Sequence, residues 1–470
     1  MPIRTTINIL IIIILSTSFL VAQEKKNKPD STHLVYAFKS GQFQGFSRSY
    51  FMSTINQGNL KDFYNFGSSI GGHYETAKWK GFQLGATASF IFNLAGTNLA
   101  ENDSTINKPS RYELGLYDVT NPSKRWDLGK LEEIYLKYYL QKSSIRIGRQ
   151  LLNTPFINPQ DGRIRPSFTE GAWLDIQHLK YFKFQAGYLW RMSPRSTVDW
   201  YNVGQSIGLY PVGRNPDGSP AGYAGQTKSA GILLGNVDFH QKNEELGTEL
   251  HIQLWDQLVS NVFNTTLLQA DWSKKLNKQG LQLHLGVQGI NQLPIGNGGN
   301  DNDSLRYFAL DNKTWILGGQ LAISSPKKWR IELNYTRIFD GGRFIMPREW
   351  GKEPLYTFIP RERNEGSANT HAFTTNLFYT FQKAGLKTKL SYGHYLLTDV
   401  KDAQSNKYAM PSYGHFELML DKNFKGKWSI LHFKLLYMYK IGYGETYNNA
   451  NFIYNKVNMH HLDLMMNLKF

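Results

Sequence analysis

The sequence predicts an all-β protein, a transmembrane up-and-down antiparallel β-barrel of about 18 strands. Three observations predict it. Apolar and polar residues alternate with period 2 through much of the 470-residue chain, helical periodicity is nearly absent, and short lysine-bearing turns alternate with long loops. In outer-membrane barrels the short turns face the periplasm and the long loops face the outside. The predicted location is therefore the bacterial outer membrane.

The amino-terminal segment, residues 1–22, has the pattern of a signal peptide. Arg4 supplies a basic start, residues 9–20 supply an apolar stretch, and Ala22 is a small residue at a plausible cleavage point. The alternative is an uncleaved anchor, which the short apolar stretch and the charged residues after it disfavour. We expect residues 23–38 to form a flexible periplasmic lead-in and residues 39–470 to form the barrel.

Individual runs have the length and pattern of membrane-crossing strands. Residues 82–93, 182–192 and 429–441 each place apolar or aromatic side chains on one face and mostly polar ones on the other. Runs of about ten residues suit a tilted strand in a bilayer. The last run, residues 462–470, alternates in the same way and ends in Phe470. This aromatic carboxy-terminus is similar to the assembly signal of outer-membrane proteins, so the barrel-assembly machinery is an expected partner.

The connections give the strand count. Eight short polar turns carry lysine, and they lie at residues 76–81, 141–144, 180–183, 240–245, 273–280, 324–329, 382–387 and 421–427. Long connections run roughly over residues 53–65, 94–130, 149–171, 193–227, 257–263, 293–312, 339–369, 397–411 and 442–456. Eight turns join sixteen strands, and one more strand at each end makes eighteen. A soluble propeller or sandwich is the alternative, but the signal peptide and unequal loops favour the membrane barrel.

The charge is strongly positive, with a formal net charge of +16, and cysteine is absent. The absence of cysteine excludes disulfides and thiolate metal sites. Basic residues on the polar faces of predicted strands are expected to line the lumen: Arg146, Arg191, Arg330, Lys387, Lys389 and Lys434. Such residues favour anionic solutes, although a generic polar lumen wall explains them equally well. No nucleic-acid-reading motif accompanies the charge, so nucleic acid is not an expected partner.

Two long loops carry the residues of interest. Residues 148–171 contain three prolines together with Arg149, Asp161, Arg163 and Arg165, which suggests a binding loop between two strands. The second loop, residues 341–366, combines aromatic and acidic residues with basic ones, among them Arg348, Arg361 and Arg363. This composition suits a solute vestibule. The alternative, slightly favoured, is an extracellular lid braced by its own salt bridges.

Enzyme and metal motifs are weak. The sequence GQSIG at residues 204–208 matches a nucleophile elbow, but loop surrounds Ser206 where a strand and a helix are required. His460 and His461 are adjacent, so a strand directs them to opposite faces and they cannot share a metal. The sequence therefore predicts no enzyme, no metal site and no cofactor, and a hydrolase acting through Ser206 is a remote alternative.

Residues 147–171 (IGRQLLNTPFINPQDGRIRPSFTEG) and 346–366 (MPREWGKEPLYTFIPRERNEG) resemble the outer-membrane porin D (OprD-like) family of substrate-selective porins. Relatives are eighteen-stranded barrels whose third extracellular loop folds inward and narrows the pore, while a ladder of basic residues guides carboxylate-bearing solutes. The resemblance implies that Asp161, Arg163 and Arg165 lie near the constriction. It also implies that Arg149 lies at the root of the loop and that Arg146 and Arg191 belong to the ladder.

The expected function is passive diffusion of small, anionic or zwitterionic, carboxylate-bearing solutes. The predicted pore residues are Arg146, Arg149, Asp161, Arg163, Arg165, Arg191 and Arg330, with Arg348, Arg361 and Arg363 in a second-loop vestibule. Outer-membrane lipid and lipopolysaccharide are expected partners, and monomer and trimer both remain open. The alternative function is a structural or adhesive barrel, or a subunit of a larger complex, without channel activity.

Overall fold

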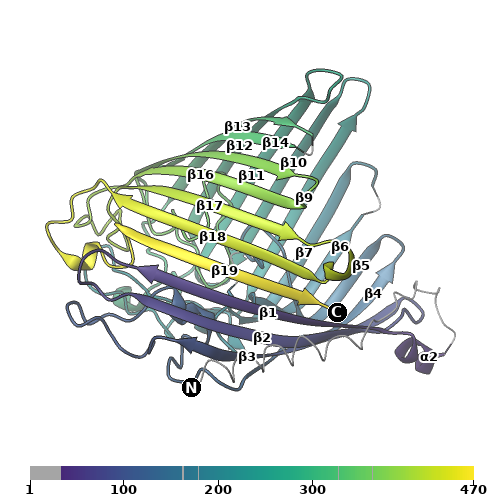
Figure 1. Ribbon diagram of the computed structural model, residues 1–470, viewed down its shortest axis with the longest axis horizontal. Coiled ribbons are helices and arrows are strands. Elements are labelled where there is room, and N and C mark those ends of the chain that lie inside the picture. Colours follow the sequence, from purple (N-terminus) through teal and green to yellow (C-terminus); the bar gives the residue numbers. More distant parts are fainter. Residues whose placement is uncertain (1–32, 161–162, 178, 327, 363) are drawn as a thin grey trace.

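The computed structural model describes residues 33–160, 163–177, 179–326, 328–362 and 364–470. This part of the chain forms a closed antiparallel barrel of 18 long strands, which confirms the predicted fold class (Figure 1). The strands are β1 (Gln42–Ile55), β2 (Phe63–Glu75), β3 (Phe82–Gly96), β4 (Leu128–Leu140), β5 (Ser143–Gln150), β6 (Phe168–Ile176), β7 (Phe182–Ser193), β9 (Ile232–Asn243), β10 (Thr248–Val259), β11 (Phe263–Lys275), β12 (Gln282–Pro294), β13 (Thr314–Ser325), β14 (Trp329–Ile338), β15 (Thr370–Phe381), β16 (Leu386–Leu396), β17 (Tyr413–Asn423), β18 (Leu431–Gly442) and β19 (Met459–Lys469).

The remaining elements are short. The two-residue strand β8 (Tyr201–Asn202) pairs with the end of β7. The helices are α2 (Leu34–Lys39), η2 (Glu113–Leu116), η3 (Gly204–Ser206), η4 (Asp303–Leu305), η5 (Gly426–Trp428) and η6 (Ala450–Phe452). In the described part of the chain, none of the helices is long and apolar enough to cross a membrane.

The barrel closes between its first and last strands. β1 pairs with both β2 and β19, with Ser49 opposite Met466 in the closing pair. Beyond β19, the Phe470 amide donates to the Gly45 carbonyl at 3.0 Å, and the Gly45 amide donates to the Phe470 carbonyl at 2.6 Å. Closure pairs the backbone groups of both strands, as a lipid environment requires.

The two faces of the wall have opposite polarity. On β12, the side chains of Leu285, Val287 and Leu293 are exposed on the outside, whereas Gln288 and Gln292 between them are buried. An apolar exterior and a polar interior are the reverse of a soluble protein and the rule for membrane barrels.

All eight predicted short turns are confirmed. The observed turns lie at residues 76–81, 141–142, 177–181, 244–247, 276–281, 326–328, 382–385 and 424–430. Helix α2 and the carboxy-terminus lie at the turn end of the barrel, and the longer loops project from the opposite end (Figure 1). One predicted long loop, residues 257–263, is wrong: β10 and β11 pair up to Val259 and Phe263, which leaves a tight turn of residues 260–262.

The amino-terminal region is described only from residue 33, so the predicted signal peptide lies outside the described residues. Residues 34–38 of the expected flexible lead-in belong instead to helix α2. Its Ala37 carbonyl accepts a hydrogen bond of 2.9 Å from the Ala77 amide in the first short turn. This contact attaches the helix to the rim of the barrel.

Candidate solute pathway and its two cavities

Loop 339–369, between β14 and β15, crosses the interior of the barrel. On one side, Gln288 of β12 donates to the Pro354 carbonyl at 2.9 Å, and Tyr356 donates to Asp271 of β11 at 2.7 Å. On the other side, Arg361 donates to Asp463 of β19 at 2.7 Å. Because β11 and β19 are nearly opposite in the strand order, the loop spans the lumen from wall to wall.

This crossing loop lies between two cavities. The outer cavity, of about 720 Å³, is lined by the long loops 194–231, 295–313, 339–369 and 397–412. The inner cavity, of about 960 Å³, is lined largely by inward-facing strand residues toward the short-turn end. The two cavities share no lining residue, and loop 339–369 contributes Arg343 to the outer one and Tyr356 and Arg361 to the inner one. The loop therefore divides the lumen.

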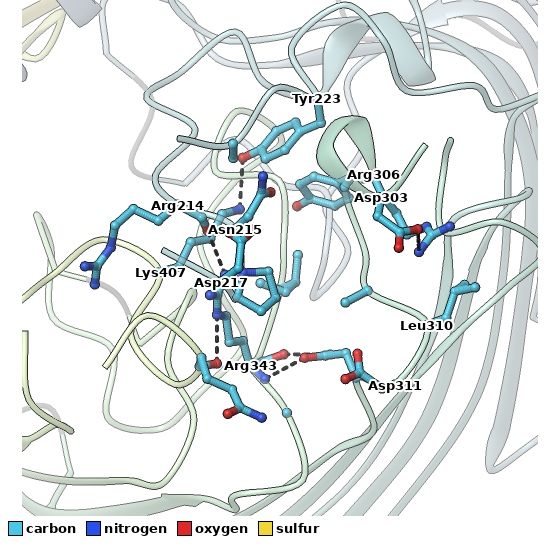
Figure 2. A pocket seen from close by; sticks show the side chains of 18 of the residues that line it. Arg214, Asn215, Asp217, Tyr223, Asp303, Arg306, Leu310, Asp311, Arg343 and Lys407 are labelled. Atoms are coloured by element: carbon cyan, nitrogen blue, oxygen red, sulfur yellow. Dashed lines mark hydrogen bonds and ion pairs between the residues drawn. The ribbon is translucent and has the colours of Figure 1, made fainter. Parts of the chain in front are cut away.

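The outer cavity presents carboxylates, while its basic groups are already engaged (Figure 2). Asp217 and Asp311 are exposed, and the exposed Asp303 pairs with Arg306 at 2.5 Å. Arg343 donates to the carbonyls of Gln404 at 3.0 Å and Arg214 at 2.8 Å. Its burial lowers the pKa of Arg343 to about 10. The charge of Arg343 thus serves to join loops and is not displayed to a solute.

Lys407 lines the outer cavity. Its Nζ donates to the hydroxyl of Tyr223 at 2.9 Å and lies over the rings of Tyr223 at 4.7 Å and Tyr307 at 5.0 Å. Burial lowers the pKa of Lys407 to about 8. Glu365 is its nearest carboxylate, at 4.0 Å. These contacts of Lys407 hold loops 194–231, 295–313, 339–369 and 397–412 together at the wall of the cavity.

The inner cavity is electropositive. Its lining contains six basic side chains, Arg48, Lys352, Arg361, Lys389, Lys434 and Lys469, and two acidic ones, Glu332 and Asp421. Several like charges around one cavity create a positive potential that attracts anions. Lys389 and Lys434 are two of the predicted lumen residues. The sequence analysis missed Arg48, because Phe46, Tyr50 and Met52 share its face of β1 and serines occupy the opposite face, so alternation does not mark Arg48 as lumen-facing.

A buried chain of hydrogen bonds fixes two loops to the seam of the barrel. Arg361 donates to Asp463, whose other oxygen lies 3.2 Å from His461 Nε2. His461 Nδ1 lies 2.8 Å from the Thr54 hydroxyl, which donates to Glu113 of loop 97–127 at 2.5 Å. Burial raises the pKa of Glu113, opposed by its hydrogen bonds and by His461. Loops 97–127 and 339–369 thus share one attachment on β1 and β19.

The predicted residues of the first loop are tied to the wall. Arg165 pairs with the buried carboxylate of Glu132 on β4 and lies 4.3 Å from the ring of Phe46 on β1. Arg163 is buried, and its carbonyl accepts from Arg48 at 3.0 Å. Asp161 lies outside the described residues. The charge of Arg165 is therefore offset by its own carboxylate partner.

Arg146 and Arg330 point into the barrel. Arg146 alternates with the exposed Ile145 and Ile147, and its guanidinium lies 4.6 Å from the ring of Tyr135. Arg330 donates to Glu332 at 2.5 Å and to Gln320 at 3.0 Å. That Arg146 and Arg330 contact the solute remains a prediction.

Arg149 and Arg191 require a correction, because they do not face the lumen. Arg149 lies two residues after Ile147 and opposite Ile134, and both of these isoleucines are exposed on the outer face. Arg149 bonds to Glu170 at 3.1 Å. A bulge between β6 and β7 places Arg191 opposite Glu170, on the same outer face. Both arginines therefore belong to the outer rim of the barrel.

The second-loop vestibule is also corrected. Arg348 pairs with Glu365 at 2.6 Å and stacks on Tyr408 at 3.8 Å, and it lines neither of the two cavities. Arg361 lines the inner cavity and pairs with the wall. Arg363 lies outside the described residues. The loop is anchored by strand partners distant in sequence, which its own composition does not reveal.

The hydroxyl of Ser206 makes hydrogen bonds that join two loops, and neither partner is a catalytic base. Its side chain is fully buried in η3, and the hydroxyl donates to the Val203 carbonyl at 2.7 Å. It accepts from Trp350 Nε1 at 2.9 Å. A nucleophilic serine requires a base within hydrogen-bond reach, and the partners described for this hydroxyl are a carbonyl and an indole.

A closed barrel with an apolar exterior, a polar interior and solute-sized cavities within it defines the class of outer-membrane porins. A family model described as outer membrane porin, OprD family, matches residues 81–358. The chain belongs to the OprD family of outer-membrane porins. The family and its structural neighbours are porins, which are not enzymes. A search of curated proteins found no match.

Solved structures share the fold at low sequence identity. OccK9 (OpdG) of Pseudomonas aeruginosa superposes with a TM-score of 0.70 at 12% identity, over 92% of this chain and 99% of that chain. OpdK of the same organism, solved with vanillate, gives 0.65 at 14% identity, covering 92% and 99%. OccAB2 of Acinetobacter baumannii gives 0.66 at 14% identity, covering 93% and 99%.

Proposed function

We propose that this porin admits small anionic or zwitterionic, carboxylate-bearing solutes by passive diffusion. The observation that carries the proposal is the inner cavity, whose lining has six basic side chains and two acidic ones. Two of the six, Arg361 and Lys389, pair with the wall carboxylates Asp463 and Glu417, and basic groups still outnumber acidic ones when these two are counted. A positive potential raises the local concentration of anions, and conduction requires that each anion be bound weakly enough to leave again. The relative OpdK was solved with vanillate, a carboxylate, which agrees with this solute class.

We propose that loop 148–171, the third loop, narrows the pore together with loop 339–369. Two contacts between the loops support this. Asn158 donates to the Lys352 carbonyl at 3.0 Å, and Ser167 donates to the Glu349 carbonyl at 2.6 Å. In this proposal Asp161, Arg163 and Arg165 lie close to the narrowest part of the pathway.

The selectivity test removes two charges of the inner cavity. For Arg48→Ser combined with Lys434→Ser, we expect the reversal potential in planar bilayers under a salt gradient to move by several millivolts toward cation preference, because the attracting potential is weaker. The matched control, Lys274→Ser with Lys278→Ser, removes two exposed lysines at the short-turn end. An unchanged reversal potential in the cavity variant would refute the proposed role of the basic residues.

A second candidate is a structural or adhesive barrel without channel activity. The observation that favours it is the division of the lumen by loop 339–369 between the two cavities. Single-channel recording decides between the candidates, since a complete absence of current would leave only the second. The proposal also includes three partners or states. Phe470 would signal to the assembly machinery, the barrel would contact lipopolysaccharide, and the protein would be a monomer or a trimer.

A further inference from the structure

The structure assigns a lipid-binding role to the outer face of β5–β10: we propose that it binds a phosphate-bearing lipid of the outer leaflet. The headgroup would contact a cluster that we call the rim cluster, made of Arg149, Glu170, Trp190, Arg191 and Trp200. The acyl chain would lie in an apolar groove below it. This site faces away from the lumen and does not depend on the proposed solute selectivity.

The rim cluster lies on the membrane-facing side at the loop end of the barrel. Arg149 follows the exposed Ile145 and Ile147 on the outer face of β5 and is one residue from the loop end of that strand. Glu170 and Arg191 are each within three residues of the loop ends of β6 and β7. Tryptophans at this level are typical of the boundary between hydrocarbon and headgroups.

The charges of the rim cluster leave a net positive site. Glu170 accepts from Arg149 Nε at 3.1 Å and from Trp190 Nε1 at 3.0 Å, and Arg191 Nη1 lies 3.9 Å away. Two guanidinium groups therefore share one carboxylate. The arginine side chains remain 24% and 37% exposed. An anion from outside can approach both of them.

The guanidinium of Arg149 is held in place through its Nε, which leaves its two terminal amino groups as hydrogen-bond donors for a ligand. The Trp200 ring lies 4.6 Å from it, and Arg191 Nη2 donates to the Trp200 carbonyl at 2.9 Å. Within the described residues, no hydrogen bond involves the two terminal amino groups of Arg149, since Nε alone reaches Glu170. A planar guanidinium with two parallel donors matches the geometry of a phosphate group.

The apolar groove lies on the same outer face, farther from the rim. Its volume is about 380 Å³, and its lining includes Leu174, Phe184, Val237 and Leu254. Leu174 is four residues beyond Glu170 along β6, or roughly 13 Å at the rise of a strand. This separation is within the reach of a lipid whose headgroup contacts the rim cluster.

Small residues open the groove. An added Cβ on Gly235 would meet nothing within 4 Å, and Ala186 lies opposite it on β7. Asp256 at the edge is already satisfied by Asn264 at 3.0 Å and Thr266 at 2.7 Å. A basic headgroup site above an open apolar groove identifies the occupant as a lipid rather than free phosphate.

The test compares lipids with and without phosphate on the full-length folded protein. Native mass spectrometry in detergent would measure the retention of diphosphorylated lipid A and of its dephosphorylated form. For Arg149→Gln with Arg191→Gln, we expect about tenfold weaker binding of the phosphorylated lipid and unchanged binding of the dephosphorylated one. A tenfold change corresponds to the loss of about one charge-assisted pair. For Gly235→Leu, which fills the groove, we expect weaker binding of both lipids.

The control is Arg337→Gln, which removes another outer-face arginine at the loop end of β14, where its Nη2 donates to Asn369 at 2.7 Å. We expect this variant to bind lipid as the wild type does. Equal retention of both lipids by the wild type would overturn the proposal, as would unchanged binding in the double variant. Displacement of the lipid by millimolar inorganic phosphate alone would show an anion site without lipid specificity and would also overturn it.

Discussion

At the scale of single residues, the pair of Arg361 and Asp463 has the clearest consequences. Arg361 is 8% exposed and Asp463 is fully buried, and the two residues lie 102 positions apart in the chain. Removing one member of a buried pair leaves the other charged and without its partner, which is more costly than losing the attraction alone. The pair therefore fixes loop 339–369 to the wall.

For Arg361→Met we expect the attachment of loop 339–369 to weaken by about 3–5 kcal/mol. Amides of the loop should exchange hydrogen faster, and single-channel recordings should show larger and noisier current steps. Asp463→Asn added to this variant should recover part of the loss, because no unpaired carboxylate remains. Lys242→Met, which breaks the exposed pair with Glu244, is the control. Exchange rates that match the control in the Arg361 variant would exclude the anchoring role.

Glu113 predicts a pH dependence for loop 97–127. Burial raises the pKa of this carboxyl, so the folded state favours its neutral form. When the pKa of a carboxyl group is higher in the folded state than in the unfolded state, its contribution to the stability of the fold is fully present below the unfolded pKa. That contribution is lost as the pH rises through the folded pKa. We expect amides of loop 97–127 to be best protected at acidic pH and less protected as pH increases.

Glu113→Gln should remove this dependence, because glutamine imitates the neutral carboxyl. The same chain of hydrogen bonds also contains His461, Asp463 and Arg361. The wild type and the Glu113→Gln variant must therefore share these three residues unchanged. The measurement is hydrogen exchange over a series of pH values. If both proteins lose protection in parallel, the titrating group is a different member of the chain.

Residue placement was partly predictable from the sequence. Arg146 and Arg149 are three positions apart, so alternation alone sends them to opposite faces of one strand. Assigning both to the lumen overlooked this rule. Arg191 was not predictable in the same way, because a bulge in the pairing of β6 with β7 decides its face. A bulge adds one residue to one strand and reverses the pattern beyond it.

At the scale of elements, strands and turns were predictable because their causes are local. Alternation over ten residues and a lysine-rich turn are both visible within short windows of sequence. The connection at residues 257–263 was predicted too long, because Gln257, Ser260 and Asn261 have the composition of a loop. In the structure β10 and β11 pair as far as Val259 and Phe263, so only residues 260–262 form the turn.

The path of loop 339–369 was not predictable, because its partners are distant in sequence. It is held by β11, β12, β18 and β19, through contacts such as Gln288 to Pro354 and Lys440 to the Arg361 carbonyl at 3.2 Å. The sequence showed a dense mixture of charges and aromatics, and this composition fits a lid as well as a segment inside the barrel. The three-dimensional partners decide between the two.

At the scale of the whole molecule, the chain terminus lengthens the pair of strands that closes the barrel. Phe470 extends β19 by two backbone hydrogen bonds to Gly45, and its ring covers this glycine so closely that a Cβ there would displace the ring. If β1 and β19 did not pair, the sheet would have two edges with unpaired backbone groups, which is unfavourable in a membrane.

Deleting Phe470 should lower the yield of folded, heat-modifiable barrel severalfold, because the closing pair is shortened. Phe470→Tyr, which retains the ring and the backbone bonds, should fold as the wild type does. Refolding into vesicles and assembly in cells should be compared. A loss in cells alone would indicate recognition by the assembly machinery, and normal yield of the deletion variant in both settings would contradict any role for the terminus.

The division of the interior has a kinetic consequence. A tube of uniform bore carries a flux that rises in proportion to concentration. In this barrel six basic side chains line the inner compartment, and the outer compartment is separated from it by a loop anchored on opposite walls. Passage then requires transfer between two compartments of limited capacity. Uptake should saturate with rising solute concentration, with a half-saturation value set by occupancy of the inner compartment, as turnover does in an enzyme.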